Sequence, residues 1–139
     1  MFLHSIPEGT AIGVGYATGD LSFGLMTALA ISIHNIPEGM AISLSMRSAG
    51  AGLARCFWFS VLSSLPQPIV ALPALYLTAH FLTLLPWGLG FAAGAMLYVA
   101  LHELTPDAVA DSGIRGASLG TSLGFATMAT CTLVLSYFL

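Results

Sequence analysis

HSIPEGTAI at residues 4–12 recurs as HNIPEGMAI at residues 34–42, and only the second and seventh positions of the two copies differ. Each copy carries polar residues inside an otherwise apolar run. The copies lie in adjacent apolar segments joined by a short turn near residues 18–22, so the sequence predicts an antiparallel pair of helices. Paired motifs in antiparallel helices form a pseudo-twofold site, an arrangement common near the middle of the bilayer in membrane proteins built from inverted repeats.

The composition is that of a membrane protein. Of 139 residues, 57% are hydrophobic and only 6% are charged, against a charged share of about 25% in soluble domains. The mean hydropathy is +0.92. Three arginines and no lysine give no basic surface for nucleic acid. The sequence therefore predicts a multi-pass integral membrane protein in contact with lipid.

The long apolar runs predict an all-α fold, a polytopic membrane helix bundle, because none of them shows a sustained period of two. A membrane-spanning helix needs about 20 residues, so residues 1–139 are expected to form a single transmembrane domain of about five helices. The expected helices are residues 1–17, 21–46, 56–79, 86–105 and 117–139. The first is short for a full span, and we expect it to be a truncated helix.

The arginines predict the orientation of these helices. Five crossings place the loops at residues 46–55 and 106–116 on one side of the membrane, and these loops contain Arg47, Arg55 and Arg115. The loops on the other side contain neither Lys nor Arg. The positive-inside rule therefore makes the arginine side cytoplasmic and puts the C-terminus on the opposite side.

Each motif places a histidine and a glutamate four residues apart, which puts both on one helix face. A charged side chain at the bilayer centre costs about 2.5–3.5 kcal/mol, and no arginine lies near Glu8 or Glu38 in the sequence. A divalent cation held together with His4 and His34 would compensate this cost. Imidazole and carboxylate ligands suit Zn²⁺, Fe²⁺ or Mn²⁺ better than Ca²⁺. The alternative is a pair of protonated glutamates that hydrogen-bond across the two helices.

Glycines spaced four residues apart predict close contacts between helices. The pairs are Gly9 and Gly13, Gly90 and Gly94, and Gly120 and Gly124. Packing alone explains them, and we expect no direct chemistry there.

The two motifs resemble the paired HNxPEG-type motifs in the fourth and fifth membrane helices of the ZIP family of divalent-metal transporters, especially its GufA-like branch. LGFAAGAMLY at residues 89–98 and HELTP at residues 102–106 resemble the seventh helix of that branch. The resemblance extends along the whole chain. It implies the five-helix C-terminal portion, family helices four to eight, of a transporter that carries zinc or another divalent transition metal into the cytosol and is not an enzyme.

The resemblance also implies a binuclear metal site between the two motif helices. One metal would be held by His4, Glu8, His34 and Glu38. The other would be held by Ser5, Glu8, Asn35, Glu38 and Gln67, so that both glutamates bridge. Ser5 stands where the family usually has Asn, and Gln67 where it commonly has Glu. The neutral amide of Gln67 predicts a weaker second metal, and a hydrogen bond in helix packing is an equal alternative.

A second pair of polar residues, His102 and Glu103, is adjacent in sequence and therefore points to different helix faces. One of them is a candidate for the metal pathway near its cytoplasmic exit, and a simple interfacial position is the alternative.

Two other functions compete with transport. A membrane-embedded metallohydrolase would use Glu8 or Glu38 as a general base on metal-bound water, but the sequence contains no HExxH motif. A non-transporting metal-binding or regulatory fragment would pair with a second copy as a homodimer, or with the missing N-terminal helices of a full-length protomer.

Overall fold

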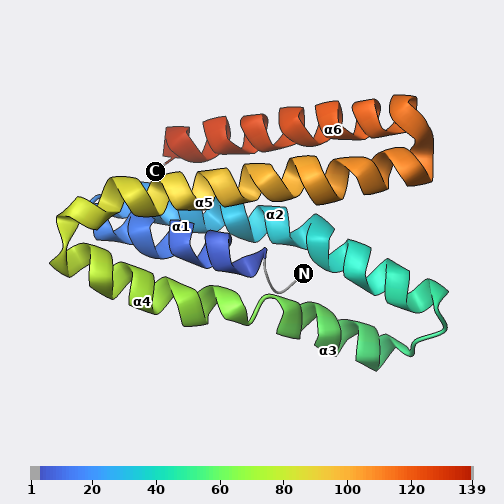
Figure 1. The fold of residues 1–139 in the computed structure, drawn as a ribbon, viewed down its shortest axis with the longest axis horizontal. Helices are drawn as coiled ribbons and strands as arrows, with labels where there is room; N and C mark the ends of the chain where they lie inside the picture. The colour runs from blue at the N-terminus through green and yellow to red at the C-terminus, as the bar shows by residue number, and fades with distance from the viewer. Residues whose placement is uncertain (1–3, 139) are drawn as a thin grey trace.

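The computed structural model describes residues 4–138, which form an all-helical bundle without a β-strand (Figure 1). The elements are α1 (Ser5–Ala17), α2 (Leu21–Ser48), α3 (Leu53–Ser63), α4 (Pro66–His80), the 3₁₀ turn η1 (Leu82–Leu84), α5 (Leu85–Val99), the π-helical turn η2 (Ala100–Leu104) and α6 (Thr105–Phe138). The predicted all-α class is confirmed for these residues. Residues 1–3 of the first predicted helix and residue 139 of the last lie outside the described part.

The turn between α1 and α2 makes the two motif helices antiparallel (Figure 1). Gly19 has a φ of 80°, which glycine adopts without steric cost. The Asp20 side chain then caps α2 by accepting hydrogen bonds from the backbone N–H groups of Ser22 at 2.9 Å and Phe23 at 3.2 Å. This turn lies where the sequence predicted it.

α1 lies against α2, α4 and α5 and forms the centre of the described bundle. Gly9 and Gly13 allow its close contact with α4, because a Cβ atom at either position would collide with the backbone carbonyl of Gln67 or of Ala71. The predicted packing role of this glycine pair is confirmed. The other two pairs differ, since Cβ atoms at Gly90, Gly94, Gly120 and Gly124 would meet only open space.

The third predicted helix, residues 56–79, is divided in the structure. α3 ends at Ser63 and α4 begins at Pro66. Proline has no N–H group to continue a helix, and the backbone N–H groups of Ser64 and Leu65 instead bond the carbonyls three residues earlier, both at 3.2 Å. The interruption brings Gln67, in the first turn of α4, against the start of α1.

The predicted loop at residues 106–116 is wrong in most of its length, because helix continues from α5 through η2 into α6. Pro106 is compatible with that continuation at the first turn of α6. The direction of the chain changes only at Gly113, where φ is 69° and ψ is 169°. Figure 1 shows the remainder of α6 returning beside α5 from this point.

Large apolar side chains point outward over much of the bundle. Trp87 is 78% exposed and Leu53 is 74% exposed, as expected where lipid surrounds the protein. Two helical stretches in the described chain, Leu53–His80 and Leu82–Phe138, are long and apolar enough to cross a membrane. A membrane helix bundle is consistent with these features, and the count of five spans stays a prediction.

Candidate metal centre

The first motif is buried at the start of α1. Ser5 is 2% exposed and Glu8 is 3% exposed, and His4 immediately precedes the helix. The Glu8 carboxylate lies within electrostatic range of His4, at the N-cap of α1, and of His34 and Glu38 on α2. The structure therefore places the two motifs beside each other, as the repeat predicted.

Glu8 is the end point of a chain of hydrogen bonds that joins three helices. The Asn35 Nδ2 group on α2 donates to the Gln67 Oε1 atom on α4 at 2.9 Å. The Gln67 Nε2 group in turn donates to the Glu8 Oε2 atom on α1. The structure thus brings three of the seven predicted ligands into one connected group, and Gln67 is itself 9% exposed.

The second motif is less enclosed than the first. His34 is exposed and Glu38 is half-buried in α2. Among residues 4–138, no three His, Cys, Asp or Glu side chains are gathered closely enough to enclose a metal ion. Joint ligation by His4, Glu8, His34 and Glu38 therefore stays a prediction.

Three buried side-chain nitrogen or oxygen atoms among the described residues have no hydrogen-bond partner, and all three belong to predicted metal ligands. They are both ring nitrogens of His4 and the Oδ1 atom of Asn35. A buried polar group without a partner costs about 1–3 kcal/mol. An unprotonated histidine nitrogen or the amide oxygen could coordinate a divalent cation, so these atoms fit the ligand preferences of a transition metal.

The remaining predicted ligand of the first motif, Ser5, connects α1 to the end of α3. Its hydroxyl donates to the Ser63 carbonyl oxygen at 2.8 Å. Ser63 has an orphan carbonyl because α3 stops there, so the bond satisfies a helix terminus that would otherwise be unpaired. The hydroxyl oxygen of Ser5 retains lone pairs that can accept a bond or a cation.

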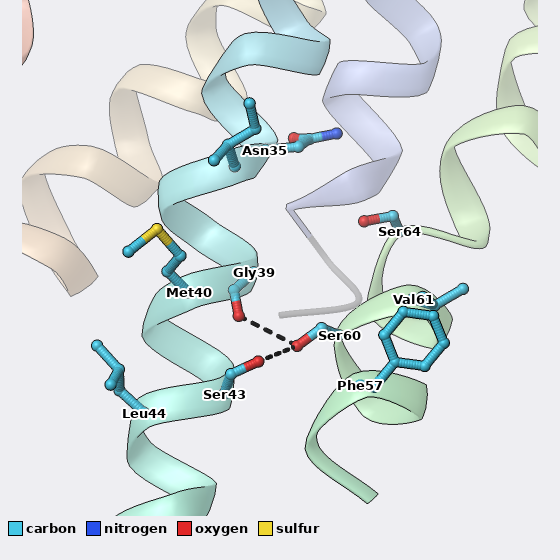
Figure 2. Close-up of a pocket in the computed structure, with 10 residues that line it drawn as sticks. Asn35, Gly39, Met40, Ser43, Leu44, Phe57, Ser60, Val61 and Ser64 are labelled. Carbon is cyan, nitrogen blue, oxygen red and sulfur yellow. Dashed lines mark hydrogen bonds between the residues drawn. The ribbon is translucent and has the colours of Figure 1, made fainter. Parts of the chain in front are cut away.

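A groove of about 750 Å³ between α2 and α3 opens beside Asn35. The Ser60 hydroxyl on α3 donates to the Gly39 carbonyl oxygen on α2 at 3.1 Å and lies 2.8 Å from the Ser43 hydroxyl. Figure 2 shows these bonds and the Asn35 amide extending away from α2. This polar contact was not predicted from the sequence, although Asn35, Gly39 and Ser43 follow each other at intervals of four residues on one helix face.

His102 and Glu103 lie apart from this group, in the π-helical turn η2, and both are exposed. The His102 ring stacks on Tyr98 with 4.3 Å between ring centroids, and its Nδ1 atom lies 3.2 Å from the Tyr98 carbonyl oxygen. The structure therefore gives His102 local partners, and the predicted pathway role of the pair stays a prediction.

Comparison with known proteins supplies the family. The chain is 41% identical over 125 residues to the zinc transporter GufA of Myxococcus xanthus, covering 90% of this chain and 49% of that protein. It is 40% identical over 128 residues to the zinc transporter ZIPB of Bordetella bronchiseptica, covering 92% of this chain and 41% of that protein. It is 36% identical over 132 residues to the human zinc transporter ZIP11, covering 91% of this chain and 39% of that protein.

The chain therefore spans less than half the length of each of these relatives. Their names are those of transporters, so the metallohydrolase alternative has no support among them. The family model of the ZIP zinc transporters matches residues 1–132. This chain, an integral membrane protein, belongs to the ZIP zinc transporter family.

Proposed function

We propose that this chain forms the metal-handling part of a transporter that moves divalent metal ions, zinc foremost, across a membrane toward the cytosol. The observation that carries the proposal is the set of buried, unpartnered atoms on His4 and Asn35 beside the Glu8 carboxylate. These atoms have the chemistry of transition-metal ligands. The family membership and the printed names of the relatives support zinc as the ion.

The proposed site has two adjacent metal positions between α1 and α2. The first position is bounded by His4, Glu8, His34 and Glu38. The second is bounded by Ser5, Asn35 and Gln67 and shares the two glutamates. Burial of Ser5, Glu8 and Gln67 supports this assignment, because buried polar side chains in lipid surroundings concentrate at functional sites.

The proposed direction, toward the cytosol, is the one that the family resemblance implies, and the proposed orientation identifies the cytosolic end of the path. If the loops with Arg47, Arg55 and Arg115 face the cytosol, the groove beside Asn35 lies on the cytosolic side of the motifs, because it follows α2 and α3 toward the loop that joins them. His102 and Glu103 are proposed pathway residues nearer the same side. Lipid covers the exposed apolar surface of the bundle.

Metal uptake by cells tests the proposal. Cells that lack their own high-affinity zinc uptake, expressing this chain in the membrane, should accumulate more radioactive zinc than cells expressing the Glu38→Ala variant at equal membrane level. Reduced accumulation with the wild-type chain would reverse the proposed direction. Equal accumulation, with zinc binding retained by the purified wild type, would contradict transport by this chain.

That last outcome would favour the second candidate, a non-transporting metal-binding or regulatory fragment. The coverage of 39–49% of the relatives' length is the observation behind this alternative. Its proposed protein partners are a second copy of the chain, or the N-terminal helices of a full-length protomer. Co-purification of differently tagged copies would distinguish a homodimer from a monomer.

A further inference from the structure

We infer that Gln67 is a positioning residue for Glu8, and that its amide closes the second metal position in the metal-free protein. The inference rests on the proposed function, because it concerns how the same site takes up its ions. It assigns to Gln67 a hydrogen-bond donor role toward the site in place of an oxygen-ligand role.

The direction of the hydrogen bonds carries the argument. The Gln67 group that faces Glu8 is the Nε2 donor, which suits a carboxylate oxygen that accepts hydrogen bonds. The Oε1 atom of the same amide is turned the other way, where it accepts from Asn35 Nδ2 at 2.9 Å. A metal ion shared by Gln67 and Glu8 would therefore meet an N–H group and not an oxygen.

Rotation of the Gln67 amide alone does not open the second metal position, because the Asn35 amide would have to rotate with it. Rotation would put Oε1 against the Glu8 oxygen and Nε2 against the Asn35 Nδ2 donor, so both existing hydrogen bonds would become repulsive contacts. The Asn35 amide would have to rotate as well, and its unpartnered Oδ1 atom would then accept from Gln67. Asn35 and Gln67 therefore cannot both offer their oxygens to the second position while they bond each other.

The closure leaves the first position open to a metal ion. His4 has both ring nitrogens without a partner, and the Gln67 bond engages only the Oε2 atom of Glu8. Fixing one carboxylate oxygen orients the other, which is how residues behind a ligand raise metal affinity. The Gln67 backbone is fixed by its close approach to Gly9, and the two hydrogen bonds to Asn35 and Glu8 hold the amide.

Titration calorimetry with zinc, on the full chain in detergent, tests the inference. The wild type should bind one zinc ion tightly. Gln67→Leu, which removes the amide, should still bind one zinc ion but with affinity about 10- to 100-fold lower. Gln67→Glu replaces the donor by a second carboxylate beside Glu8, and it should bind two zinc ions.

The matched control is Thr78→Val, because Thr78 and Gln67 are the two buried residues of α4. This variant should leave zinc affinity and stoichiometry unchanged while it alters the interior of the same helix. Thermal unfolding of each variant without metal shows whether a loss of affinity reflects misfolding. If the Gln67→Leu protein is less stable and yet binds zinc as the wild type does, Gln67 contributes only to helix packing and the inference is overturned.

The outcomes separate the inference from the proposed function. If the wild type binds two zinc ions and Gln67→Leu loses only the second, Gln67 is an ordinary ligand and the inference is overturned. If the wild type and Gln67→Glu both fail to bind zinc while folded, the proposed metal site itself fails. One tight ion in the wild type, weaker binding in Gln67→Leu and two ions in Gln67→Glu support both.

Discussion

At the scale of single residues, Glu8 is a buried carboxylate held among other polar residues of the two motifs. It is 3% exposed, accepts a hydrogen bond from Gln67 and lies within electrostatic range of three other motif residues. Burial of this kind in lipid surroundings is costly unless the group is compensated. The two glutamates and the two histidines should therefore differ in how much metal binding depends on them.

Replacing either Glu8 or Glu38 with Ala should abolish zinc binding at both positions, because each carboxylate is proposed to bridge. His4→Ala should weaken mainly the first position. The loss for the glutamates should exceed the roughly 10- to 100-fold loss that follows changes behind a ligand. Calorimetry measures this, with Asp111→Ala as a control on an exposed carboxylate outside the motifs. A Glu8→Ala protein that still bound zinc with the wild-type affinity and stoichiometry would contradict the bridging assignment.

Acidification should weaken zinc binding, because protons compete with the metal for histidine and carboxylate ligands. Histidine has a reference pKa of about 6.5, so a fall from pH 7.5 to 5.5 protonates most free histidine. Affinity should fall by about tenfold or more across this range. The fall should be smaller in a His4→Ala protein, which has one histidine fewer to protonate. An affinity that does not change with pH would argue against histidine ligation.

At the scale of elements, the contact between α1 and α4 depends on glycine. Gly13→Ala should lower the free energy of unfolding by about 1–3 kcal/mol, because its Cβ atom has no room against the Ala71 carbonyl. Gly90→Ala should instead raise it by up to about 1 kcal/mol, because Gly90 is helical with open space around it. Thermal or denaturant unfolding in detergent compares the two. Equal effects would mean that the contact does not set the stability.

The elements also show what the sequence could predict. The antiparallel motif helices and the turn at Asp20 follow from local signals, and both were predicted correctly. The break before Pro66 had its signal in the two nearby prolines, but the apolar run through it masked the interruption. The loop predicted at residues 106–116 failed because Pro106 and Asp107 suit the first turn of a helix as well as they suit a loop.

For the site, the sequence supplies candidate residues, and their joint ligation of a metal stays a prediction. The repeat identifies His4, Glu8, His34 and Glu38 from sequence spacing, and the resemblance adds Gln67. The partner of Gln67 is 59 residues away in the chain, and no local pattern shows whether an amide will present its oxygen or its N–H group. That choice is made by tertiary packing of α1, α2 and α4, which the sequence alone does not display.

At the scale of the whole molecule, the predicted orientation is open to direct measurement. Ala49→Cys, between α2 and α3, and Thr83→Cys, between α4 and α5, are both exposed and lie at opposite ends of the bundle. In a background with Cys56 and Cys131 replaced by Ser, a membrane-impermeant maleimide added to intact cells should label Thr83→Cys. It should label Ala49→Cys only after permeabilisation. The reverse pattern would invert the predicted topology and put the groove beside Asn35 on the side opposite the cytosol.

The π-helical turn η2 changes the phase of the long helical segment that follows α5. The Thr105 backbone N–H donates to the Ala100 carbonyl oxygen five residues earlier, and this i to i+5 pattern accommodates one residue more than a regular turn. At 3.6 residues per turn, one extra residue rotates everything beyond it by about 100°. A regular helical wheel drawn from Gly90 to Asp111 therefore places the residues after the π-helical turn on the wrong face of the helix. Cross-linking or cysteine accessibility measured along this segment should vary with the helical period both before and after His102. The phase of the second part should be shifted from that of the first by about a quarter turn.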